Sequence, residues 1–299
     1  MIKLWICLIS FLIFFLPYNI FASSFEDIFN LYKNAQTDGI YLEPDDNELN
    51  EAKSIFNSIF KNSSNINSMK TSFDKLHLKL TMVNIENKQY YVISEEKGYK
   101  TGRGFYIFPQ KINSKNALQM PHSKKDIHTG KIGLLSFLEG EFAAAAFNSV
   151  PRNYKHGSKI INADLADFPK SYFISFAIAF ARQFPNGYLI QLHGFSTNKR
   201  KTNIGKKSRF IVSPGSFDID MNLKKLDFCL ENKFLTLSSL FPIEIRELGG
   251  TKNEIGLALR KTGHNNFIHI EINKSIRDKL VSNKNARLDL IKCFDELKK

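Results

Sequence analysis

Cysteine and tryptophan are scarce in this 299-residue chain, which has three cysteines and one tryptophan. Three cysteines are too few for a scaffold in which disulfides replace a hydrophobic core. Cys7 lies in an apolar N-terminal stretch, which leaves Cys229 and Cys293 for the folded body. The sequence leaves open whether these two form a disulfide or two separate buried thiols, because separation along the chain does not give distance in space.

Acidic residues are also fewer than basic ones, 29 against 42, for a formal net charge of +13. Such an excess attracts anionic partners and aids solubility. The lysines are scattered, and no aromatic-basic platform or nucleic-acid module accompanies them. We therefore expect no nucleic-acid binding.

Long apolar runs are missing except at the N-terminus. Residues 4–16 are apolar over about thirteen positions, fewer than the roughly twenty that a membrane-spanning helix needs. Lys3 precedes this run and the small residues 22–24 follow it, which is typical of a secretory signal peptide. We expect cleavage after Ala22 or Ser24, no permanent membrane span afterwards, and a periplasmic or secreted protein.

The remaining chain shows two periodicities. Apolar residues recur at helical spacing within residues 24–61, and a serine- and asparagine-rich linker is expected at 62–68. From residue 76 the period changes to two, which indicates an antiparallel start to a sheet. The predicted organisation is a signal peptide (1–22), an N-terminal helical segment packing on the main domain (23–70), and an α/β metallohydrolase domain (71–299).

Strands and helices alternate beyond residue 115. Apolar runs predict strands at 117–120, 188–192 and 267–272, and helices at 171–184 and 285–297. The segment 227–237 remains unassigned. This alternation predicts an α/β fold with a mixed, largely parallel twisted sheet flanked by helices, of phosphorylase/hydrolase-like class.

Polar residues follow the three predicted strands. The first leads into His122 and Asp126, the second into His193, and the third into Glu271. Ligands of open α/β sheets gather at the carboxyl ends of strands, so these side chains converge if the strands are neighbours. Two imidazoles and a carboxylate suit a catalytic Zn²⁺ site with a position left for water. We expect His122, Asp126 and His193 to be the ligands and Glu271 to be the general base.

Motifs in a fixed order extend this pattern: Pro-His-Ser at 121–123 with Asp126, Asn-Ser-Val-Pro-Arg-Asn at 148–153, Leu-His-Gly at 192–194, and Ile-Glu-Ile at 270–272 with Arg277 after it. Over residues 117–280 this order resembles the zinc carboxypeptidase superfamily in its broad sense, including the N-formylglutamate amidohydrolase-like and succinylglutamate desuccinylase-like branches. The resemblance implies a substrate-binding role for Arg152 and Asn153, and a catalytic role for Arg152 in holding a carboxylate or polarising the scissile carbonyl. The glycine-containing loop 248–253 resembles an active-site loop of the amidohydrolase-like branch.

The chain departs from that superfamily in its first motif. Relatives use His-x-x-Glu, whereas the acidic residue here follows as His-x-x-x-Asp, with Lys125 at the usual ligand position. His128 is therefore an alternative third ligand. His269 alternates with buried-type isoleucines and is expected to be structural or to lie outside the ligand shell.

These features predict an exported zinc-dependent hydrolase that cleaves an amide bond in a peptide or N-acyl amino acid, with cell-wall peptides as available substrates. Export weighs against a substrate of cytosolic amino-acid catabolism. The alternative is a non-catalytic envelope or secreted binding protein on the same scaffold that recognises an acidic ligand. Hydrolysis of an ester or phosphate by the same site, and the oligomeric state, remain open.

Overall fold

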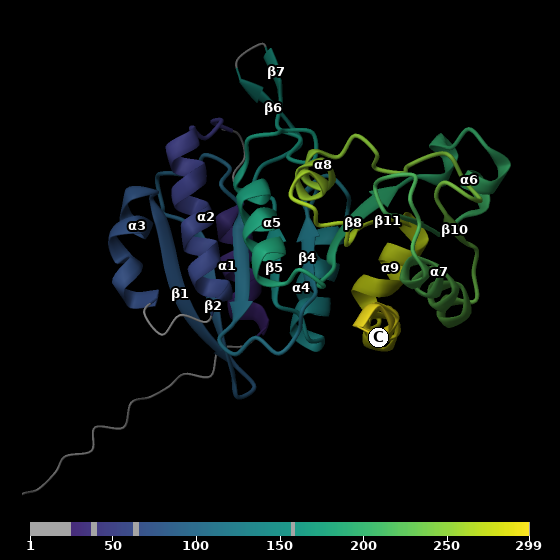
Figure 1. Ribbon diagram of the computed structural model, residues 1–299, viewed down its shortest axis with the longest axis horizontal. Helices are drawn as coiled ribbons and strands as arrows, with labels where there is room; N and C mark the ends of the chain where they lie inside the picture. Colours follow the sequence, from purple (N-terminus) through teal and green to yellow (C-terminus); the bar gives the residue numbers. More distant parts are fainter. Residues whose placement is uncertain (1–24, 37–40, 62–65, 157–158, 299) are drawn as a thin grey trace, which may run out of the picture.

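The structure is a computed structural model that describes residues 25–36, 41–61, 66–156 and 159–298, so the predicted signal peptide lies outside the described residues. A nine-stranded mixed sheet carries helices on both faces (Figure 1), which confirms the predicted α/β class. The strands follow the order β1-β2-β3-β5-β4-β8-β11-β9-β10. Their bounds are β1 (Leu78–Ile85), β2 (Lys88–Glu95), β3 (Phe105–Pro109), β4 (Ala117–Met120), β5 (Ala144–Phe147), β8 (Leu189–Phe195), β9 (Phe210–Ser213), β10 (Ser238–Leu240) and β11 (Phe267–Asn273).

Parallel pairing is concentrated at the centre of the sheet. β5, β4, β8 and β11 run parallel, as do β9 and β10. β1, β2, β3 and β5 pair antiparallel, so the antiparallel start predicted from the period of two is present. β9 is antiparallel to β11. A separate hairpin of β6 (Asn153–His156) and β7 (Lys159–Asn162) projects at the top of Figure 1.

Helices bury apolar stripes on both faces. One face is covered by α2 (Asp46–Phe60), α5 (Tyr172–Gln183) and α8 (Glu254–Lys261). The other is covered by α1 (Phe25–Ala35), α4 (Thr129–Glu139), α7 (Met221–Phe234), α9 (Lys274–Ser282) and α10 (Lys284–Asp295). The two helices of the N-terminal segment thus pack on opposite faces, with Tyr32 in one core and Phe56 in the other.

The remaining helical elements are short: α3 (Lys70–Lys75), α6 (Asn203–Lys207), η1 (Ile66–Met69), η2 (Thr197–Lys199) and η3 (Glu296–Lys298). η1 overlaps the C-terminal end of the stretch expected to be a linker, at residues 66–68. α7 occupies most of the unassigned 227–237 segment. Within the described residues, no helix is long and apolar enough to cross a membrane.

Asparagine and serine caps fix where several helices begin. Ser171 accepts a hydrogen bond from the backbone N–H of Ile174 at the start of α5. Asn253 and Asn273 cap α8 and α9 in the same way. Such caps satisfy N–H groups that the helix itself leaves unpaired. Two of these capped helix starts, at α8 and α9, lie next to cavities at the carboxyl ends of the central strands.

Cys229 on α7 and Cys293 on α10 form a disulfide, which settles the alternative left open by the sequence. Their Cα atoms lie 5.5 Å apart and their separation along the chain is 64 residues. Closing a loop of this length stabilises the fold by about 4 kcal/mol in the chain-entropy account. The disulfide joins two helices on the same face of the sheet.

Candidate metal centre

The three strands predicted to carry the site are neighbours. β4, β8 and β11 lie side by side and parallel, so their carboxyl ends share one edge of the sheet. His122 follows β4, His193 lies in β8, and Glu271 on β11 is the register partner of His193. The convergence expected from the strand ends is therefore present.

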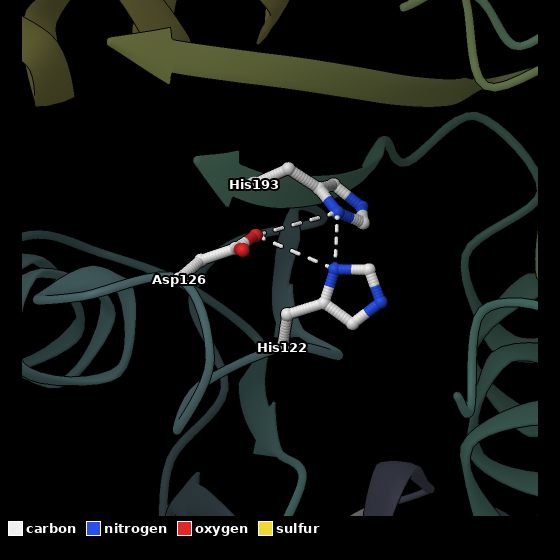
Figure 2. A group of neighbouring side chains, drawn as sticks. All are labelled: His122, Asp126 and His193. Carbon is white, nitrogen blue, oxygen red and sulfur yellow. Dashed lines mark hydrogen bonds and ion pairs between the residues drawn. The ribbon is translucent and has the colours of Figure 1, made fainter. Parts of the chain in front are cut away.

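His122, Asp126 and His193 point toward one another (Figure 2). His122 Nδ1 lies 3.1 Å from His193 Nδ1 and 3.3 Å from Asp126 Oδ2, and His193 Nδ1 lies 4.0 Å from the same oxygen. Ligand atoms at roughly 2.0–2.1 Å from a tetrahedral zinc ion stand about 3.4 Å from one another. The donor types and their spacing therefore fit zinc.

The opposite nitrogens of both imidazoles are held by acceptors. His122 Nε2 lies 2.7 Å from Asp164 Oδ1, and His193 Nε2 lies 3.1 Å from Gln191 Oε1. Because these oxygens only accept hydrogen bonds, each Nε2 is the donor. Nδ1 of each ring is thereby left facing the cluster. Metal-binding histidines are usually oriented in this way by a hydrogen bond from their other ring nitrogen.

A local turn explains the unusual His-x-x-x-Asp spacing. The backbone N–H groups of Lys125 and Asp126 both donate to the carbonyl of His122, at 2.9 Å. Such a turn places residues four apart on one side, so Asp126 reaches the cluster while Lys125 is exposed. The backbone N–H of Gly194 donates to Asp126 Oδ2 at 2.8 Å and fixes the carboxylate.

The two histidines are driven to different protonation states. Burial disfavours the charged form of His122, but hydrogen bonds and charge from Asp126 and Asp164 outweigh it and raise its pKa to about 9. Burial, together with electrostatic repulsion from His269, His122 and Arg152, holds the pKa of His193 well below its ordinary value. A cation at Nδ1 of His122 would compete with the proton held there, so the affinity of this site for a metal would decrease as pH falls.

Asp164 and Gln191, which hold the two imidazoles from behind, are residues that the sequence did not reveal. Asp164 is the charged one of the two. Asp164 follows β7 in a turn, where its Oδ1 also accepts a hydrogen bond from the backbone N–H of Ala166. Burial opposes ionisation, but His122 and Arg152 lower the pKa of Asp164. The surrounding Asn-Ala-Asp-Leu-Ala-Asp at 162–167 is ordinary turn composition. Only the fold brings this carboxylate to His122.

The two residues expected to bind substrate are placed differently. Arg152 Nε lies 2.5 Å from Asp164 Oδ2 as an ion pair, and the Arg152 side chain remains 42% exposed beside the cluster. Asn153 is exposed on β6. It does not line the cavities at the site.

His269 lies beside the group of His122, Asp126 and His193 without being part of it. Its ring packs on that of His193 with centroids 4.1 Å apart, and its Nε2 lies 3.3 Å from Glu271 Oε1. His193, His269 and Glu271 form a second group that could hold a cation. The Nε2 of His193 is engaged with Gln191, so its single free Nδ1 serves one group or the other.

Two atoms of this second group lack partners. Glu271 Oε2 and His269 Nδ1 are buried and make no hydrogen bond. Buried polar atoms are rarely left unpaired, so both point to a ligand, a cation or a proton donor in the cavity. His128, the alternative third ligand, instead pairs through Nε2 with Asp278 at 3.5 Å and belongs to neither group.

Two cavities meet at the cluster, with volumes of about 360 and 500 Å³. Such volumes suit small ligands. They share the walls formed by His122, Arg152, Leu248 and Glu271. The first, which we call the glycine-loop lobe, is also lined by residues 248–253; the second, which we call the basic lobe, is also lined by Lys125, Lys199, Arg200, Lys274 and Arg277.

No family model matches the chain, and no curated protein matches it either. Among solved structures, the chain is similar to a candidate metallopeptidase from Shewanella denitrificans OS217, with 10% identity and a TM-score of 0.38 over 78% of this chain and 89% of that one. It is also similar to a candidate metallopeptidase from Shewanella amazonensis SB2B, with 8% identity and a TM-score of 0.37 over 80% of this chain and 92% of that one.

Proposed function

We propose that the protein is an exported zinc-dependent hydrolase that cleaves an amide bond in a peptide or N-acyl amino acid. The observation that carries this proposal is the convergence of His122 Nδ1, His193 Nδ1 and Asp126 Oδ2 at the carboxyl ends of neighbouring strands. Asp164 and Gln191 support it by holding the far side of each ring. A zinc ion there would polarise the scissile carbonyl and lower the pKa of water into the neutral range.

Glu271 is the proposed general base. One carboxylate oxygen, Oε1, contacts His269, whereas Oε2 is buried without a partner in the cavity wall. Oε2 can therefore take a proton from water and deliver it to the leaving amine. Arg152 lines both lobes and its Nε pairs with Asp164; in this proposal its terminal N–H groups donate to the carbonyl oxygen as charge develops on it.

Export rests on the N-terminal sequence and has support from the disulfide. Disulfides persist in oxidising compartments such as the periplasm and the extracellular space, and Cys229 and Cys293 form one. In that setting cell-wall peptides are an available substrate class. The predicted leader at residues 1–22 is removed in this proposal.

The test is turnover of N-acyl amino acids, short peptides and muropeptides by zinc-loaded wild type and by Glu271→Gln. Loss of the base should lower kcat by about 10²–10⁴-fold. Glu141→Gln, at an exposed carboxylate that does not line either lobe, is the matched control and should keep wild-type turnover.

Undiminished activity of Glu271→Gln would remove that residue from the mechanism. Zinc binding without turnover of any of these substrates would favour the non-catalytic binding protein. Turnover confined to esters or phosphates would place the same site in another hydrolase class.

A further inference from the structure

A row of buried polar side chains crosses the central strands just before the proposed metal site. Gln119 on β4 is the register partner of Gln191 on β8, which in turn is the register partner of His269 on β11. Both glutamines are fully buried, and the residues before and after each of them in its strand are apolar and buried. Burying an amide is costly unless its hydrogen bonds are satisfied, so this row needs a specific set of partners.

Gln119 is anchored by a group that can only accept a hydrogen bond. Its Nε2 donates to the backbone carbonyl of Phe173 in α5 at 3.2 Å. Because a carbonyl cannot donate, the amino group of Gln119 must face Phe173, and its Oε1 must face Gln191. Gln191 Nε2 donates to this oxygen at 2.9 Å. The other atom of the Gln191 amide, Oε1, is thereby turned toward His193.

Asn253 fixes the same amide from the other side. As the N-cap of α8, its Oδ1 accepts hydrogen bonds from the backbone N–H groups of Ile255 and Gly256. Since backbone N–H groups only donate, the amino group of Asn253 is left to face Gln191. It donates to Gln191 Oε1 at 2.8 Å. The two anchors are independent of each other, and they require the same orientation of the Gln191 amide.

Gln191 Oε1 also accepts a hydrogen bond from His193. His193 Nε2 lies 3.1 Å from it, and a carbonyl oxygen has two lone pairs for two such bonds. His193 must therefore carry its proton on Nε2, which leaves the lone pair of Nδ1 facing His122 and Asp126. Neutral amides thus set the tautomer of His193, whereas the carboxylate of Asp164 holds His122.

We infer that Gln119 and Asn253 are positioning residues for the proposed metal site. Both act through Gln191, whose amide they orient so that an oxygen, and not an amino group, faces His193. With the amide reversed, its amino group would donate to Nε2, and the proton of the ring would move to Nδ1. A protonated Nδ1 cannot bind a metal. This inference rests on the proposed function, and it explains why two glutamines are buried in the sheet.

The test is a double variant, Gln119→Met/Asn253→Asp, that reverses the Gln191 amide. Asn253→Asp keeps an oxygen that caps α8, since aspartate and asparagine cap helices about equally well. It also replaces the donor that faces Gln191 with an acceptor. Gln119→Met removes the opposite anchor and fills its place with an unbranched apolar side chain. The amino group of Gln191 should then face the new carboxylate and His193.

Two quantities are measured on the purified full chain. In metal-free protein with isotopically labelled histidine, the NMR shifts of the imidazole nitrogens report which nitrogen of His193 carries the proton, and His193→Gln assigns the signal. The proton should lie on Nε2 in wild type and on Nδ1 in the double variant. Zinc affinity, measured by competition with a chelator, should fall about 10–100-fold in the double variant.

Asn273→Asp is the matched control. Asn273 is also buried and caps α9 in the same way, but its side chain bonds to Ser275 and Ile276 instead of the glutamine row. This variant should keep the tautomer of wild type, with zinc affinity within about twofold. Gln119→Met alone should also keep the wild-type tautomer, because Asn253 still holds the amide.

Retention of the proton on Nε2 of His193 in the double variant would overturn the inference, and so would an equal loss of zinc affinity in Asn273→Asp. If the double variant does not fold, Asn253→Asp alone decides: it should shift both quantities in the same direction by less, and no shift in either would overturn the inference. The NMR readout needs neither zinc nor turnover. A tautomer that follows the anchors in a chain that binds no zinc would refute the proposed function alone.

Discussion

Asp164 determines how His122 is presented to the proposed metal. Its carboxylate lies 2.7 Å from Nε2 and leaves Nδ1 facing Asp126 and His193. Replacing Asp164 with Ala should weaken zinc binding about 10–100-fold, the usual cost of removing such a partner. Competition with a chromogenic chelator measures the change.

Asp167→Ala is the matched control, because Asp167 lines the same cavity without contacting His122. It should leave zinc affinity within about twofold of wild type. Equal zinc affinity of Asp164→Ala and wild type would contradict this role for Asp164.

His269 distinguishes the two candidate cation groups. In His269→Phe the ring can still pack on His193, but the contact with Glu271 is lost. With zinc at His122, Asp126 and His193, this variant should keep its zinc and lose about tenfold in kcat, because Glu271 is no longer held in place. Zinc stoichiometry and steady-state kinetics on the same preparation measure both quantities.

The same variant has a clear opposing outcome. If His269→Phe loses zinc while His122→Ala keeps it, the metal belongs to the group of His193, His269 and Glu271. Glu271 would then be a ligand and not the base.

At the level of elements, Asp227 couples α7 to β10 through a hydrogen bond from Ser238 Oγ at 2.5 Å. Burial, with repulsion from Glu244 and Glu231, outweighs this bond and raises the pKa of Asp227 from 3.8 to about 6. The folded state therefore holds a proton that the unfolded chain releases. This bound proton stabilises the folded state fully below pH 3.8, and the stabilisation is lost as pH rises through about 6.

Asp227→Asn should consequently raise the free energy of unfolding. The increase should be about 2 kcal/mol larger at pH 7.5 than at pH 4.5. Chemical unfolding at the two pH values measures this difference. A gain that is independent of pH, or greater at pH 4.5, would contradict the assignment.

Element prediction from the sequence succeeded where apolar runs were uninterrupted. β4, β8, β11, α5 and α10 lie where those runs are, within a few residues. α4 was not predicted, because Gly130 and Gly133 in its first turns resemble loop residues. A Cβ on these glycines would lie 2.1 Å from Tyr32 Oη and 2.5 Å from Met120 Sδ, respectively. The glycines serve close packing against α1 and β4, which no local pattern shows.

The candidate site was partly predictable for a related reason. His122, His193 and Glu271 follow or end apolar strands, so their convergence needed only that the strands be neighbours. Asp164 and the position of His269 against His193 depend on contacts between distant segments. The order of β9 and β10 at the sheet edge was also inaccessible, since short strands carry little periodicity.

For the whole molecule, the N-terminal helices are part of the same cores as the sheet. α1 packs Ile28 and Tyr32 on one face, and α2 packs Phe56 on the other. Tyr32 also lies against Gly130 at the start of α4, near the loop that carries His122 and Asp126. The start of the helix that follows the proposed metal ligands therefore packs against α1, and the excess positive charge of the chain adds long-range attraction for anions.

Zinc content is the most direct measurement of the central claim. Wild type, His122→Ala, His193→Ala and the remote control His77→Ala are purified without chelators and analysed for metal by mass spectrometry. We expect about one zinc per chain in wild type and His77→Ala, and a loss of most of it in both site variants, because three protein ligands hold a catalytic zinc. Wild type without stoichiometric zinc, or zinc retained by both site variants, would contradict the account.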